Sequence, residues 1–127
     1  MRAGVTILPL GEPTRFNPGQ LEILCDRLGE HRAETEVAHA LDRIAKGLTQ
    51  LGTPTPNGDW TAVADRVAAL VEDARLIGMS TLAQAGRHVL DCLDQGDPTA
   101  LAATLARLAR VGDRSINAIW DLDDLSG

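Results

Sequence analysis

The chain has 127 residues, a formal net charge of −6 and a sequence pI near 4.9. A chain of this length forms one domain and can bury roughly two-thirds of the surface that its unfolded form exposes. Aromatic residues make up only 2% of this acidic chain, so it lacks the basic patch and stacking platforms of nucleic-acid binders, and we expect no nucleic-acid partner. No apolar run approaches the length of a membrane span or of a signal peptide, and the two cysteines lie in separate helical patterns. We therefore expect a cytoplasmic protein without a disulfide.

The first third of the chain predicts an irregular arm followed by two helical stretches. Prolines interrupt the short apolar run of residues 1–16, so we expect no regular element there. Asn17 followed by Pro18 predicts a helix start, and Gly29 interrupts this short first helix. The helical pattern then resumes over residues 30–51. Its apolar residues recur at three- and four-residue steps and predict one buried stripe: Val37, Leu41, Ile44, Leu48 and Leu51.

The rest of the chain predicts three more helices. Residues 52–58 are rich in glycine, proline and threonine and predict a loop, after which Asp59 is the expected N-cap of a helix that Gly78 ends. A second helix ends at Gly96, and the following Asp-Pro pair opens the last one. The expected core faces of these helices are Trp60, Val63, Val67, Leu70, Ala74 and Ile77; Leu82, Ala85, Val89 and Leu93; and Leu101, Leu105, Leu108, Ile116 and Ile119.

These patterns predict an all-α fold, namely an antiparallel up-and-down four-helix bundle with a short additional helix at its N-terminal side. Four long amphipathic segments with short connections favour that arrangement. We expect the helical domain to span residues 17–122. The acidic residues 123–127 predict a tail that frays.

The sequence shows no site for metal or covalent chemistry. Glu36 and His39 have the Glu-x-x-His spacing of di-iron bundles, but no second pair exists, since Ala85 stands three residues before His88. His39 lies about 200° around the helix from Val37, which predicts a solvated side chain. Neither cysteine has a basic neighbour that would activate it, and the glycines occur singly rather than in a phosphate-binding loop. We therefore expect no metal, no cofactor and no enzymatic activity.

Residues 59–97 carry the one pattern that points to a known function. This stretch resembles the histidine-containing phosphotransfer (Hpt) domain of bacterial phosphorelays. In that family a helix carries His-x-Leu-Lys-Gly and reaches a glycine ten positions after the histidine. A second helix then begins with Leu-Ala and ends near Gly-Asp. The resemblance implies an Hpt-like four-helix fold.

Gly78, taken as the helix-ending glycine of the family, brings the rest of the pattern into register without a gap. The matching positions are Leu70, Ala74, Ile77, Leu82, Ala83, Gly96 and Asp97. The histidine position is occupied by Ala68, however, and Val71 and Glu72 replace the lysine and the glycine of the motif. A methyl group cannot accept a phosphoryl group, and Glu72 would repel one. The fold-determining half of the motif is present and the phosphate-handling half is missing.

The resemblance implies a response-regulator receiver domain or a histidine kinase as the partner. Ala68 lies about 120° from the core direction of its helix, so we expect it to face solvent or that partner. We expect Ala64, Val71, Glu72 and Arg75 to surround it as a small apolar patch edged with charge, and an exposed Val71 favours docking. The prediction is a pseudo-phosphotransferase that binds its partner without carrying phosphate. Small residues that merely suit a helix surface are the other interpretation.

Two alternatives stay open. The first is an active phosphotransfer protein that uses His39, which precedes a leucine by two residues as in the motif, although Asp42 and Arg43 replace its lysine and glycine. His88 belongs to the helix after the motif and lacks the surrounding pattern as well. The second alternative is a structural or oligomerising bundle, such as a homodimer, that covers the same helix face.

Overall fold

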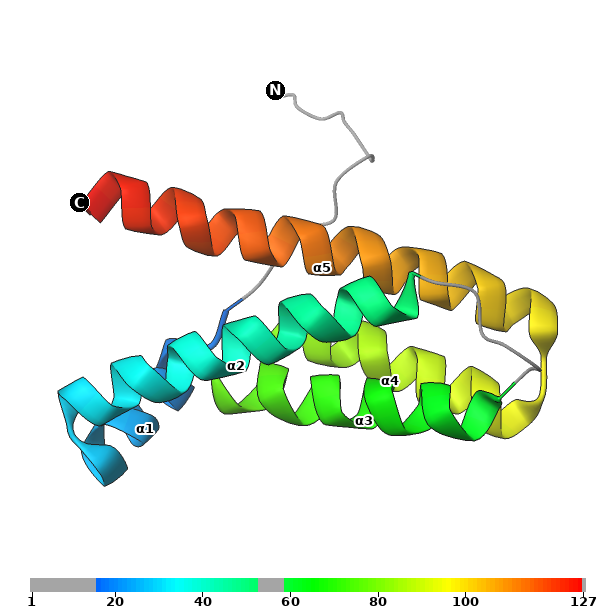
Figure 1. Cartoon of the computed structure of the whole chain (residues 1–127), viewed down its shortest axis with the longest axis horizontal. Coiled ribbons are helices and arrows are strands. Elements are labelled where there is room, and N and C mark those ends of the chain that lie inside the picture. The colour runs from blue at the N-terminus through cyan, green and yellow to red at the C-terminus, as the bar shows by residue number, and fades with distance from the viewer. Residues whose placement is uncertain (1–15, 53–58, 127) are drawn as a thin grey trace, which may run out of the picture.

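The computed structural model describes residues 16–52 and 59–126, with side chains described up to residue 119 (Figure 1). Within these ranges the chain is helical and contains no strand, which confirms the all-α prediction. Residues 1–15 of the predicted arm and most of the predicted loop lie outside the described residues. The five helices are α1 (Pro18–Leu28), α2 (Glu30–Leu51), α3 (Trp60–Leu76), α4 (Ser80–Gln95) and α5 (Pro98–Ser126).

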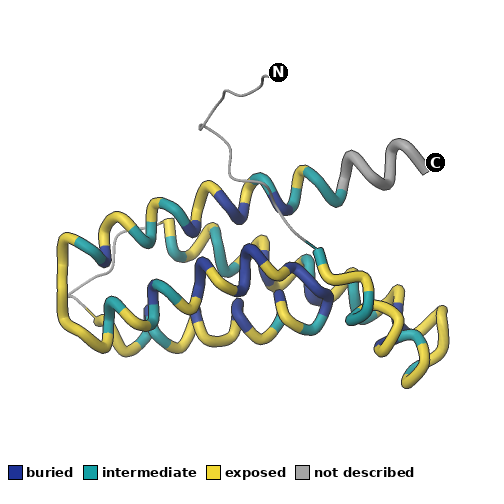
Figure 2. The backbone as a smooth tube through the Cα atoms, turned by 180° about the vertical axis from the view of Figure 1, so that it is seen from behind, coloured by how far each residue is buried: buried dark blue, intermediate teal, exposed yellow. Residues whose placement is uncertain are grey.

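The four long helices pack side by side, and α1 packs at one end of them. Helix α3 packs against α2 and α4, while α5 packs against α4 and also returns to α2. Helix α1 contacts α2 and α3 and lies beside the N-terminal part of α2 (Figure 1). Buried segments face the interior of this arrangement, and the hairpin of α1 and the start of α2 is mainly exposed or half-buried (Figure 2).

Side-chain caps begin three of the helices at the predicted residues. Asn17 Oδ1 accepts a hydrogen bond from the backbone N–H two residues on, at 3.1 Å. Asp59 Oδ1 accepts one from the N–H three residues on, at 3.2 Å. Asp97 Oδ1 accepts from both the second and the third following N–H, each at 3.1 Å. These bonds satisfy donors that have no partner inside the first turn of a helix, so local sequence determines where α1, α3 and α5 begin.

Gly78 forms the turn between α3 and α4 and joins it to the start of α1. Its φ is +79°, a conformation that side chains with a Cβ rarely adopt. Its carbonyl accepts a hydrogen bond from Asn17 N at 2.6 Å, and Phe16 forms an antiparallel bridge with Met79. A Cβ on Gly78 would collide with the carbonyl oxygen of Asn17. The turn therefore needs glycine both for its backbone angle and for the close approach of the preceding chain.

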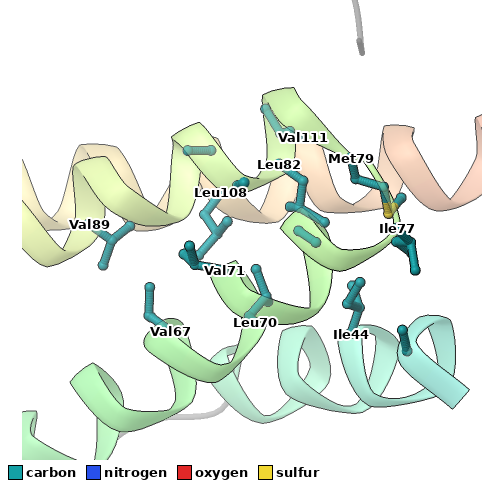
Figure 3. Packing of buried hydrophobic residues seen from close by; sticks show 14 of the residues in the cluster. Ile44, Val67, Leu70, Val71, Ile77, Met79, Leu82, Val89, Leu108 and Val111 are labelled. Carbon is teal, nitrogen blue, oxygen red and sulfur yellow. The ribbon is translucent and has the colours of Figure 1, made fainter. Parts of the chain in front are cut away.

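The predicted apolar stripes form the core. Val67 and Leu70 of α3 point toward side chains of the neighbouring helices (Figure 3). The other predicted residues of the α2 stripe pack half-buried around the fully buried Ile44. The largest fully buried side chains come from all four long helices and the α3–α4 turn: Ile44, Met79, Leu82, Leu108, Val67, Val89, Val111 and Ser115.

Trp60 is the exception to the predicted core, because 47% of it is exposed. It is the first residue of α3. Side chains of a helix lean toward its N-terminus, so a residue in the first turn extends past the end of the layer that the other helices cover. Helical periodicity places Trp60 near the apolar face but does not reveal where the core stops along the axis.

Helix α5 is longer than predicted, since it continues to Ser126 instead of ending near residue 122. No glycine or proline stands between residues 113 and 126, so nothing in the local sequence stops the helix. The residues of the expected acidic tail therefore belong to α5, apart from residue 127, which lies outside the described residues. Among the described residues, no helix is both long and apolar enough to cross a membrane.

Gly78→Ala should lower the free energy of unfolding by about 1–3 kcal/mol, because the new Cβ is strained by the positive φ and meets the Asn17 carbonyl. Gly96→Ala is the matched control: its φ is +70°, but a Cβ there meets no atom within 4 Å. Gly96→Ala should therefore lower the free energy of unfolding only by the cost of the positive φ, about 1 kcal/mol. Urea unfolding followed by circular dichroism measures both values. Equal losses in the two variants would contradict a role for the contact with Asn17.

Candidate partner-binding face

Ala68 lies in the middle of the 17-residue helix α3 and is exposed, as its helical position predicts. The next residue, Ala69, is exposed as well, and Ala64 one turn earlier is half-buried. Methyl groups therefore form part of the outer face of α3, beside the exposed carboxylates of Asp65 and Glu72. A methyl group has no lone pair and no acidic proton, so Ala68 and Ala69 can contact another molecule but cannot accept a phosphoryl group.

Two charged residues flank Ala68 on the C-terminal side. Glu72 and Arg75 form an ion pair with 3.3 Å between Oε1 and Nη1, and their side chains are 73% and 58% exposed. An exposed pair of this kind contributes little to stability, because water screens it. Both groups are consequently available to a partner at small cost.

Val71 does not belong to this exposed face, which corrects the prediction. It is buried, with 6% of its surface exposed, and it lies among the core side chains (Figure 3). The cause is the close packing of α4: a Cβ built on Gly86 would come within 2.5 Å of Val71 Cγ2. Gly86 thus lets α4 approach until Val71 enters the interface between the two helices. The glycine inside the α4 pattern was the one sequence signal for this burial.

Arg43 of α2 and Asp73 of α3 form a link that the sequence analysis did not predict. Arg43 Nε lies 3.1 Å from both carboxylate oxygens, and its Nη2 lies 2.9 Å from Oδ1. The hydrogen bonds to Asp73 raise the pKa of the Arg43 guanidinium; desolvation opposes this shift, while the charges of Asp73, Glu36 and Asp42 support it. The two residues are thirty positions apart, and no local pattern indicates that they meet. Asp73 lies about 140° around α3 from Ala68, so the link holds α3 on the α2 side and leaves the Ala68 face free.

The three histidines occupy two different environments. His31 and His39 are exposed on α2, as predicted for His39. His88 of α4 is half-buried, and its Nδ1 lies 2.8 Å from Nη1 of Arg107 on α5. A guanidinium only donates hydrogen bonds, so His88 Nδ1 accepts and the ring proton is placed on Nε2. The lone pair of His88 Nδ1 is therefore engaged in joining α4 to α5.

Neither metal ligands nor cysteines form a cluster in the part of the chain that the structure describes. No group of three or more His, Cys, Asp or Glu side chains is arranged to hold a metal ion there. Glu36 is half-buried near its helix neighbour His39, without a third ligand. Cys25 and Cys92 are both half-buried free thiols.

A double-mutant cycle on Arg43 and Asp73 should measure a coupling free energy of at most about 1 kcal/mol, because half of the arginine side chain is exposed. The coupling should weaken in high salt. Urea unfolding of Arg43→Ala, Asp73→Ala and the double variant gives this value. The same cycle on the exposed pair of Glu72 and Arg75 is the control, and we expect a smaller coupling there. A larger coupling at the control pair would contradict the proposed role of Arg43 in joining α2 to α3.

A scan of the chain against models of known protein families finds no match, and searches of curated proteins and of solved structures find none either. A functional assignment therefore depends on the residues and the geometry described above.

Proposed function

We propose that this chain is an Hpt-like protein that binds a receiver domain or a histidine kinase through α3 and carries no phosphate itself. One observation supports this proposal above the others. The α3 position at which the resemblance expects a phosphorylated histidine is exposed at mid-helix, and alanine occupies it. The helix-ending glycine of the motif, Gly78, has the positive φ of a helix terminus that only glycine adopts readily.

The fold that goes with this proposal is an antiparallel up-and-down bundle of α2, α3, α4 and α5, with α1 as the additional helix. Its support is that α2 packs against α3, α3 against α4 and α4 against α5, and that α5 returns to pack against α2. Leu48 of α2 lies over Gly112 of α5, so the last helix contacts α2, the first of these four helices. The short connections at residues 77–79 and 96–97 favour a reversal of direction at each turn.

The absence of phosphate follows from the chemistry of the face. Phosphotransfer to histidine needs an exposed ring nitrogen with a free lone pair, and Ala68 has none. Val71, at the position of the lysine in the motif, is buried and uncharged, and the charge nearest to Ala68 one turn later is the carboxylate of Glu72, paired with Arg75. His88 is a poor substitute, because Arg107 occupies one ring nitrogen.

A role in binding fits the residues that remain at the face. Alanine side chains lose almost no conformational entropy when a partner covers them, and they allow a close approach of its backbone. Without Val71 the apolar area is small, so affinity depends on shape and on the charges around Ala68. We therefore expect a transient complex, in keeping with a competitor or tether in a two-component pathway.

An active phosphotransfer protein is the second candidate, and one observation favours it. His39 is exposed on α2 and has Arg43 one turn later, where a cation can balance phosphoryl charge. The bidentate bonds of Arg43 to Asp73 weigh against it, because the guanidinium is already neutralised.

Ala68→Arg should weaken binding at least ten-fold in titration calorimetry against purified receiver and kinase domains of the same organism, because a long cation blocks close approach at the centre of the face. The matched control is Ala106→Arg, an exposed alanine on α5, a helix that does not contact α3. We expect the control to bind like the wild type. If no receiver or kinase domain binds the wild-type chain, the proposed function is wrong.

Incubation with a phosphorylated receiver should leave no acid-labile phosphate on the wild-type chain, since Ala68 offers no acceptor. Label on the protein is measured after quenching in alkaline detergent, which preserves phosphohistidine. The His39→Gln variant tests the second candidate: label that the wild type acquires and this variant loses would establish phosphotransfer through His39 and contradict the first proposal.

A further inference from the structure

The exposed large apolar side chains of the described residues are few, and one of them lies on the helix that carries Ala68. These side chains are Leu21 and Ile23 on α1 and Trp60 on α3. Trp60 is one of only three aromatic residues in the chain, and 47% of it is exposed. A tryptophan held half in water keeps a large apolar area unburied, and such side chains are enriched at the centres of binding surfaces.

Resting on the function proposed above, we propose that the partner surface extends along α3 to Trp60 and that the indole anchors a basic amphipathic helix of the partner. Trp60, Ala64 and Ala68 follow one another at intervals of four residues, so they lie on one flank of α3. The axial distance from Trp60 to Ala68 is about 12 Å at 1.5 Å per residue. The stripe consists of one large side chain, Trp60, followed by two small ones. Because the alanines allow close approach, a partner helix can cross α3 above them and contact the indole.

The position of Val71 shows which flank this is. Val71 continues the stripe and packs against α4 at Gly86. The stripe therefore runs along the α4 side of α3, while Asp73 and its bond to Arg43 lie on the α2 side. A partner helix on this flank does not need to displace the ion pair that links α2 to α3.

The charges beside the stripe determine the chemistry of the partner. Asp65 and Glu72 stand three residues before and four residues after Ala68, and both are exposed. Arg75 is the one cation near this flank in the described part of α3, and it is paired with Glu72. Two exposed carboxylates against one guanidinium leave this flank with an excess of negative charge, as in the chain as a whole with its formal charge of −6. Basic side chains on the partner would complement Asp65 and Glu72.

The same charges disfavour a second copy of this chain as the occupant. A two-fold interface through the stripe brings identical patches together, so it doubles the excess of negative charge that Asp65, Glu72 and Arg75 leave on each copy. Such an excess of like charge costs free energy and is avoided at stable interfaces. A separate basic partner has no such penalty.

The test is titration calorimetry of the full chain with a receiver or kinase domain that binds the wild type. Trp60→Ala should raise the dissociation constant at least ten-fold, whereas Trp60→Phe should keep most of the wild-type affinity. Ile23→Ala is the matched control, since Ile23 is an exposed large apolar residue on another helix. Asp65→Lys is the second variant, which leaves the apolar side chains unchanged; it should weaken binding and reduce its dependence on salt.

The outcomes separate this inference from the function on which it rests. If the wild-type chain binds and neither Trp60→Ala nor Asp65→Lys changes the affinity, the extended surface is wrong while the proposed function stands. Tighter binding by Asp65→Lys overturns the assignment of a basic partner. A concentration-dependent dimer in sedimentation velocity that Trp60→Ala abolishes would assign the surface to a second copy and overturn the proposal.

Discussion

The close packing of α3 against α4 decides which side chains of α3 are available to another molecule. Gly86 leaves no Cβ between the helices, so Val71 enters their interface and joins the core. The buried face of α3 is therefore wider than the apolar stripe in its sequence predicts. The exposed apolar residues of α3 are then Trp60, Ala68 and Ala69, which lie among charged residues of both signs. The small apolar area of the face follows from this one helix–helix contact.

The turn at Gly78 holds the end of α3 in place for that contact. Because the carbonyl of Gly78 accepts a hydrogen bond from Asn17, the residue that caps α1 also pins the α3–α4 connection. Met79 is fully buried at this point and bridges to Phe16. The start of α1, the end of α3 and the start of α4 therefore form one packed unit, and a change at this turn affects the α3 face through the backbone.

Local features of the sequence were sufficient to predict where the helices lie. Asn17, Asp59 and Asp97 cap helices through bonds that span two or three residues, so the information is contained within a single turn. Features that depend on a neighbouring helix were not predicted. The exposure of Trp60 depends on where the other helices end, and the burial of Val71 depends on a glycine fifteen residues later. The two side-chain links, Arg43 with Asp73 and Arg107 with His88, join helices whose packing no periodicity specifies.

The α2–α3 link also bears on the choice between the two functions proposed for the chain. A phosphoryl group on His39 would attract the guanidinium of Arg43, which makes three short contacts with Asp73. Arg43 would then have to leave a carboxylate whose side chain is only 17% exposed. Asp73 would keep its charge in a partly buried position without a cation, which is a costly arrangement. Binding at the Ala68 flank demands no such rearrangement, since the flank lies on the opposite side of α3. The existing packing therefore favours a surface that binds over a histidine that carries phosphate.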